Sequence, residues 1–155
     1  MSIKMVRVDD RLIHGQIVAA WVKSLNLERV WIIDDGTAND NFLKNVMRMV
    51  APSNTELVIS AESEIEQLAN QYDKDDCRTL VLVKYPYVAQ KLFESDIEFR
   101  NLDIGGIGAN ASRKKVYKNI SMTDQEIQCC REMKENGVNV YIQVTPDDKQ
   151  IPFNY

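Results

Sequence analysis

Residues 3–21 of the chain, IKMVRVDDRLIHGQIVAAW, contain two apolar segments of different length separated by a polar loop. The first segment, IKMVRV (3–8), is short and rich in β-branched residues, which predicts a strand. The second, GQIVAAWVKSLN (15–26), spaces its apolar residues three and four positions apart, which predicts a helix. A strand followed directly by a helix is the repeating unit of a parallel sheet, so this stretch predicts an α/β protein.

The same alternation continues along the rest of the chain. Strands are predicted at residues 30–34, 56–60, 79–83, 98–106 and 138–144, with a further short strand at 115–121. Helices are predicted at residues 39–50, 64–72 and 87–95, and from a capping box at Thr123 and Glu126 through Lys134, closed by Gly137. We therefore predict one doubly wound domain over residues 1–155, with a mainly parallel sheet flanked by helices.

Composition narrows the class of function. The formal net charge of −4 argues against a surface built for nucleic acid or anionic lipid, and RKK (113–115) is typical of a solvated turn. The three cysteines, Cys77, Cys129 and Cys130, have neither a disulfide pattern nor a zinc spacing, which favours reduced thiols. No apolar run approaches the roughly 20 residues that span a membrane. We expect a cytoplasmic protein.

The loop between the first strand and the first helix, DDRLIHGQ (9–16), contains the only histidine, His14. In parallel sheets, ligands gather beyond the carboxyl ends of the strands, which is where this loop lies. Gly15 allows the backbone to change direction beside His14. The first N–H groups of the helix, near Gly15 and Gln16, form a potential anion site. The loop is therefore the candidate functional site.

The charged residues around this loop allow more than one arrangement. Arg7 shares a strand face with Ile3 and Met5; we expect it either to point into the crevice or to pair with an aspartate, the candidates being Asp9, Asp34 and Asp35. Asp9 and Asp10 cannot both face a bound anion, so one is expected to orient His14 or Arg11 and the other to cap the helix or face water. Asp34 and Asp35 either shape the acidic side of the crevice or cap the helix near Asn39.

Three chemistries suit the loop. A metal site would combine His14 with carboxylates, but Arg7 and Arg11 oppose a divalent cation; its candidate ligands are Asp9, Asp10, Asp34, Asp35 and Asp40. A hydrolase would use His14 as a base but lacks a serine or cysteine nucleophile. In the third, a neutral His14 imidazole accepts a phosphoryl group whose oxygens Arg11 and helix N–H groups hold. The third is favoured. A packed, functionless histidine and an aspartyl phosphate at Asp34 or Asp35 remain alternatives.

The segment VRVDDRLIHGQI resembles the active-site signature of the IIB components of the mannose family (mannose, fructose and sorbose) of the bacterial sugar phosphotransferase system. The resemblance extends along the chain through VWIIDDGTANDNFLKNVMRMVAP, LDIGGIGA, NISMTDQEI and GVNVYIQVTPDD. Residues 107–116 fit the family pattern least well. The resemblance implies a mainly parallel sheet of about seven strands.

The resemblance also implies a phosphoryl relay. A IIA phosphohistidine donates to Nδ1 of the matching His14, which passes the group to a sugar carried by the membrane components IIC and IID. Arg11 matches the arginine near the phosphoryl oxygens, and no metal or organic cofactor is implied. Gly105 and Gly106 either bring N–H groups to the phosphate or mark a tight strand exit. A regulatory phosphoprotein using the same histidine is the alternative, and the sequence does not identify the sugar.

Overall fold

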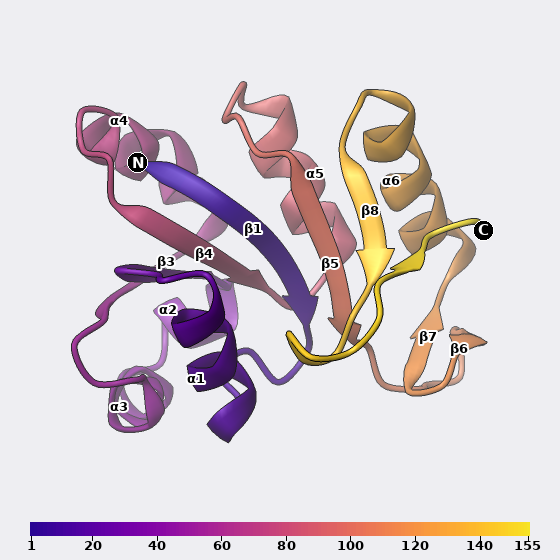
Figure 1. Ribbon diagram of the computed structural model, residues 1–155, viewed down its shortest axis with the longest axis horizontal. Coiled ribbons are helices and arrows are strands. Elements are labelled where there is room, and N and C mark those ends of the chain that lie inside the picture. The colour runs from indigo at the N-terminus through magenta and orange to yellow at the C-terminus, as the bar shows by residue number, and fades with distance from the viewer.

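A seven-stranded sheet runs through the middle of the computed structural model, which describes residues 1–155 (Figure 1). The strands lie in the order β3-β2-β4-β1-β5-β8-β9, and every pair is parallel except β8 with β9. Their bounds are β1 (Ser2–Asp9), β2 (Arg29–Ile33), β3 (Glu56–Ser60), β4 (Arg78–Val83), β5 (Asn101–Gly106), β8 (Asn139–Ile142) and β9 (Ile151–Pro152). The predicted mainly parallel sheet is confirmed.

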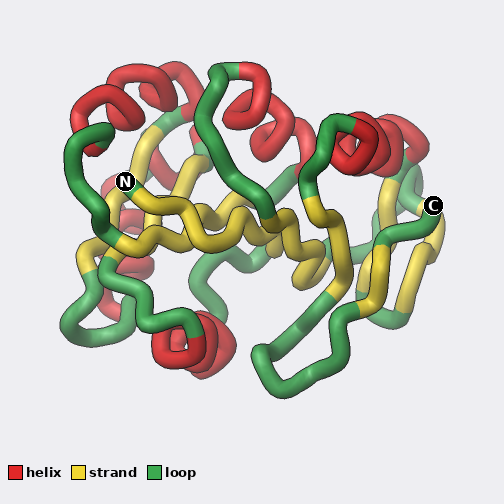
Figure 2. The backbone as a smooth tube through the Cα atoms, turned by 45° about the horizontal axis from the view of Figure 1, so that its top comes forward, coloured by secondary structure: helices red, strands yellow, loops and turns green.

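Helices cover both faces of the sheet, as Figure 2 shows. They are α1 (Gly15–Ser24), α2 (Asp35–Ala38), α3 (Asn41–Val50), α4 (Ile65–Tyr72), α5 (Pro86–Glu94) and α6 (Asp124–Glu135), with a 3₁₀ turn η1 (Glu62–Glu64) before α4. Apolar side chains of α1 and α3 pack on one face, and those of α4, α5 and α6 pack on the other. The sheet is therefore doubly wound, as predicted. β1 is its central strand, with three strands on either side, and its carboxyl end leads into the loop that contains His14.

The core forms because alternate residues of each strand face opposite helix layers. In β1, Met5 packs on the α1 side, whereas Val6 and Val8 pack on the side of α4, α5 and α6. All three side chains are at most 1% exposed. Burial of each such side chain contributes roughly 1.5–3 kcal/mol to folding, so the position of β1 is strongly fixed.

Two segments differ from the sequence-based prediction because of turns. The predicted strand at 115–121 is a hairpin outside the main sheet, formed by β6 (Lys114–Tyr117) and β7 (Ile120–Met122), with Lys118 at a φ of 38° in the turn. The predicted helix at 39–50 is preceded by the separate helix α2, because Asp34 caps α2 and Asp40 caps α3. Each aspartate accepts a hydrogen bond from backbone N–H groups that begin its own helix.

The strands between β1 and the β9 edge of the sheet also differ from the prediction. β5 begins at Asn101 instead of residue 98, and the antiparallel edge strand β9 was not predicted. The basic run 113–115 is not simply solvated, because Arg113 pairs with Glu126 and Lys114 with Asp124. These ion pairs attach the β6–β7 hairpin to the first turn of α6.

Candidate functional site

The loop between β1 and α1 is held against the protein by its two apolar residues. Leu12 and Ile13 are 1% and 6% exposed and pack in the core beneath α1. Leu12 adopts the left-handed conformation, with a φ of 57°, which turns the chain sharply within the loop. Arg11 and His14 are exposed on either side of this buried pair. The loop thus presents a cation and an imidazole from a fixed backbone.

His14 occupies the N-cap position of α1, and its side chain makes no hydrogen bond within the protein. Its carbonyl group accepts a hydrogen bond from the N–H of Ile17, which begins the helix. The next residue, Gly15, has a φ of 47°, so the chain changes direction beside His14 as expected; the backbone conformation favours glycine, whereas a Cβ atom there would meet no other atom within 4 Å. This arrangement leaves the imidazole accessible to another molecule.

The amino end of α1 adds positive character beside the imidazole. The first N–H groups of a helix, here those at Gly15 and Gln16, have no acceptor within the helix, and the helix dipole is positive at this end. The first turn of α1 contains no acidic residue that would neutralise this end. The N-terminus of α1 and His14 are therefore suited to the same anion.

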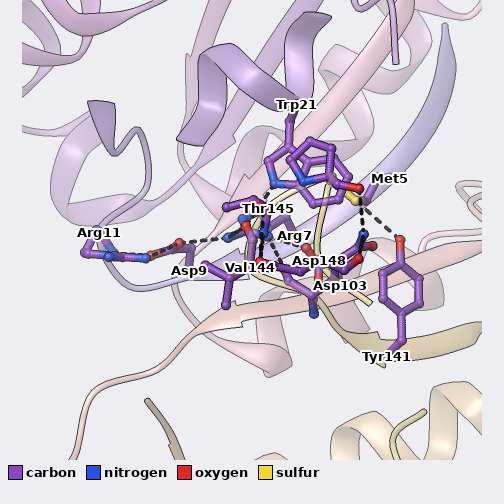
Figure 3. Close-up of polar contacts among 12 residues, drawn as sticks. Met5, Arg7, Asp9, Arg11, Trp21, Asp103, Tyr141, Val144, Thr145 and Asp148 are labelled. Atoms are coloured by element: carbon purple, nitrogen blue, oxygen red, sulfur yellow. Dashed lines mark hydrogen bonds and ion pairs between the residues drawn. The ribbon is translucent and has the colours of Figure 1, made fainter. Parts of the chain in front are cut away.

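Asp9 orients Arg11 through a two-point contact (Figure 3). Arg11 Nε donates to Asp9 Oδ1 at 2.9 Å, and Arg11 Nη2 donates to Asp9 Oδ2 at 2.9 Å. The hydrogen bond with Asp9 raises the pKa of Arg11 above its usual value. Because Asp9 holds one edge of the guanidinium, the Nη1 edge of Arg11 remains free to donate to an anion. An aspartate of this loop was expected to orient either His14 or Arg11, and in the structure Asp9 orients Arg11.

Arg7 lies behind this pair in the interior, with 1% of its surface exposed. Its Nη1 donates to Asp103 and to the carbonyl group of Gln143, and its Nη2 donates to Asp9 and to the carbonyl group of Val144. The guanidinium also lies 5.6 Å from the ring centroid of Trp21. Of the two predicted arrangements, the ion pair with Asp9 is the one formed, and the expected position in the crevice is not.

Asp103 is the site residue that sequence reasoning missed. It lies directly opposite Arg7 in the β1–β5 register and is fully buried. Burial raises the pKa of the Asp103 carboxyl group, whereas the ion pair with Arg7 and the hydrogen bond from the N–H of Gln143 lower it and favour the charged form. A signal was available: a lone acid within the apolar run LDIGG must be paired with a cation if the strand is buried.

Gly105 and Gly106 provide space for the two arginines. A Cβ atom on residue 105 would overlap the guanidinium of Arg7, and one on residue 106 would lie 3.2 Å from Nη2 of Arg11. Both glycines stand at the carboxyl end of β5, as predicted for a strand exit, and neither has a positive φ. Their lack of a side chain is what allows arginine side chains from β1 and its loop to cross the neighbouring strand.

The other aspartates predicted to lie near the site, Asp10, Asp34 and Asp35, form hydrogen bonds with other segments. Asp10 Oδ2 accepts a hydrogen bond from the N–H of Gly108 at 2.7 Å, so Asp10 neither caps α1 nor faces water alone. Asp34 caps α2 and lies 3.5 Å from Lys84 Nζ, and Asp35 accepts from the N–H of Glu62. Of the two roles predicted for Asp34, helix capping is observed, at α2 instead of near Asn39. No three acidic, histidine or cysteine side chains lie close enough together to hold a metal ion.

An exposed histidine at a helix N-terminus, in the same loop as an arginine held by a buried carboxylate, defines an α/β protein with a potential anion site at the carboxyl edge of its sheet. Residues 3–155 match the family model described as the PTS system sorbose subfamily IIB component. The chain belongs to this family of phosphotransferase-system IIB components.

Individual relatives agree with the family assignment. The chain is 30% identical over 152 residues to the sorbose-specific EIIB component of Klebsiella pneumoniae, covering 97% of this chain and 92% of that protein. It is 27% identical over 153 residues to the fructose-specific EIIB component of Bacillus subtilis, covering 99% and 94%. It also matches the mannose-specific EIIAB component of Escherichia coli, at 23% identity, and spans 47% of that longer protein.

Solved structures show the same fold. The crystal structure of the IIBSor domain of the sorbose permease from Klebsiella pneumoniae has a TM-score of 0.92 at 27% identity, covering 98% of this chain and 93% of that chain. The crystal structure of manxB from Thermoanaerobacter tengcongensis has a TM-score of 0.90 at 29% identity, covering 98% and 92%. In the present chain, no helix combines the length and the apolar character required to cross a membrane.

Proposed function

We propose that this chain is the phosphoryl carrier of a sugar phosphotransferase system, which receives a phosphoryl group on His14 from the phosphohistidine of a IIA component. His14 then passes the group to a sugar that the membrane components IIC and IID bind. The carrier works in the cytoplasm and reaches the membrane through IIC and IID. The observation that carries the proposal is the exposed imidazole of His14, at the N-cap of α1 and three residues beyond Arg11.

The transfer step requires an unprotonated ring nitrogen on His14 and positively charged or N–H groups around the phosphoryl oxygens. A ring nitrogen of neutral His14 attacks the phosphorus atom; a new P–N bond forms as the donor P–N bond breaks, and the donor imidazole leaves with the bonding electron pair. Charge develops on the three equatorial phosphoryl oxygens. The free edge of Arg11 and the N–H groups at the start of α1 would donate hydrogen bonds to these oxygens, which supports the proposal.

The same geometry suits release of the group. A phosphoryl group on His14 brings close to two negative charges, and one exposed arginine together with a helix end offsets them only in part. An accessible ring can also be reached by two partners in turn, first by the IIA donor and then by the sugar-bearing membrane components. A deeply buried histidine with several arginines would hold the group too tightly for a relay.

The experiment is a two-stage transfer with purified components. The chain is first incubated with phosphorylated IIA, and its intact mass is measured; sugar and membrane vesicles that contain IIC and IID are then added. We expect one phosphate, stable in base and labile in acid, that disappears only when both sugar and vesicles are present. A group that is not discharged by sugar would contradict the relay and indicate a regulatory phosphoprotein. A base-labile group would indicate an acyl phosphate on an aspartate.

A further inference from the structure

Four charged side chains of alternating sign connect the buried core to the exposed loop: Asp103, Arg7, Asp9 and Arg11 (Figure 3). We propose that Asp103 and Arg7 are positioning residues, which hold Arg11 in its working orientation by acting through Asp9. This inference rests on the proposed function, since Arg11 is the group whose orientation would support the phosphoryl oxygens.

Hydrogen bonds fix the orientation of the two buried members of this series, Asp103 and Arg7. Asp103 accepts hydrogen bonds from Arg7 and from the N–H of Gln143, the latter at 2.9 Å. The four N–H bonds on the terminal nitrogens of Arg7 all have acceptors, two of which are the carbonyl groups of Gln143 and Val144 at 2.8 and 3.0 Å. Arg7 therefore has no terminal N–H left for a phosphoryl oxygen, and its influence on the site is indirect.

Asp9 is the link between the inner and outer arginines. Its carboxylate is 1% exposed and accepts from both, but the contact with Arg7 is 3.4 Å, whereas the two contacts with Arg11 are 2.9 Å. Asp103 balances the charge of Arg7, so Asp9 is free to bind Arg11 more closely. Without Asp103, Asp9 would be the only carboxylate near Arg7 and would be drawn inward, away from Arg11.

The test is a double-mutant cycle on single-turnover transfer from phosphorylated IIA. Asp103→Asn keeps the size of the side chain but removes its charge, and we expect it to slow transfer about tenfold in the otherwise native chain. In an Arg11→Ala background the same substitution should change the rate by no more than about twofold, because there is no guanidinium left to orient. Equal slowing in both backgrounds, or no slowing in either, would overturn the proposal.

One control variant and one further test variant distinguish a positioning role from a general loss of structure or of activity. Asp76→Asn makes the same chemical change at an exposed residue beside the amino end of β4, and should leave the rate unchanged. Arg7→Lys keeps the charge but cannot bridge both carboxylates, and should slow transfer like Asp103→Asn even if the latter variant fails to fold. If the native chain itself accepts no phosphate from IIA, the proposed function fails; if it does and the cycle shows no coupling, only the positioning role fails.

Discussion

The guanidinium group of Arg7 occupies the space in which residue 105 would carry a side chain. Gly105 belongs to β5, the strand beside β1, and a Cβ atom built there would overlap Cζ, Nη2 and Nε of Arg7. The glycine is required by this close approach, because its backbone has no positive φ. Gly105 and the buried Arg7 are thus two parts of one packing arrangement in this chain.

Gly105→Ala should therefore destabilise the protein. The added methyl group must displace either Arg7 or β5, and overpacking of this kind costs about 1–3 kcal/mol. The free energy of unfolding in urea measures this loss. Gly36→Ala is the matched control, because a Cβ atom there meets nothing closer than 3.5 Å and Gly36 lies within the helix α2. Equal stability of the two variants would contradict the assigned role of Gly105.

A second prediction concerns the anchor of the loop, Leu12. Leu12→Ala should lower the free energy of unfolding by about 3 kcal/mol, since the side chain is 1% exposed. Leu12→Gly should be no worse, although it is smaller, because a φ of 57° costs a non-glycine residue about 1–2 kcal/mol. Urea unfolding compares the two directly. A glycine variant clearly less stable than the alanine variant would show that the loop does not require this backbone conformation.

A third prediction concerns Asp10, which joins the loop to the segment after β5. Asp10→Ala removes the acceptor of the Gly108 N–H, and loss of a charged hydrogen bond should speed exchange of that amide hydrogen about tenfold. Hydrogen exchange followed by NMR gives the rate. The Glu62 amide, which donates to Asp35 at the start of α2, serves as the internal control. No acceleration at Gly108 would mean that Asp10 does not hold this segment.

The local parts of the fold were readable from the sequence. Periods of two and of three to four residues predicted β1 and α1. The alternation within β1 correctly placed Arg7 with Met5 on the side of α1, where Arg7 lies over Trp21. Ile3 was expected on the same face but packs on the other, because the register shifts between Ile3 and Met5. The position of His14 at the carboxyl end of β1 followed from the same pattern, since parallel strands gather functional loops at that edge. These features depend on residues close together in the chain.

The rest depended on contacts that no local pattern contains. Asp103 lies 96 residues from Arg7, so the sequence could require a partner for Arg7 without naming it. The β6–β7 hairpin was predicted as one strand because its turn is formed by Lys118 and Asn119, without the glycine that usually marks such turns. The role of Gly105 was hidden for the same reason, because the arginine that it accommodates comes from another strand.

A fourth prediction concerns acid stability at the opposite end of the sheet. Arg29, 4% exposed, is held by Asp75 and Glu56, and the hydrogen bond with Arg29 holds the pKa of Asp75 well below its usual range. A carboxyl group with a lowered folded-state pKa stabilises the protein above its unfolded pKa of about 3.9, and this contribution disappears as the pH falls further. Asp75→Asn should therefore be less stable at pH 7 and should lose less stability on acidification.

The magnitude is modest because Asp75 is 39% exposed and Glu56 remains as a partner. Screening by water reduces the expected loss at neutral pH to roughly 1 kcal/mol. Urea unfolding from pH 7 to pH 2 measures it, with the exposed neighbour Asp76→Asn as the control. If Asp75→Asn shows the same pH profile as the native chain, the Arg29 cluster does not contribute to acid stability.

The most direct test of the relay uses the fact that His14 is the only histidine in the chain. Long-range proton–nitrogen NMR spectra of the ¹⁵N-labelled protein then contain one imidazole, whose two nitrogens can be followed before and after incubation with phosphorylated IIA. We predict that Nδ1 shifts and gains coupling to phosphorus while the mass rises by one phosphate. An unchanged imidazole spectrum in a chain that has gained phosphate would contradict the assignment of His14 as the carrier.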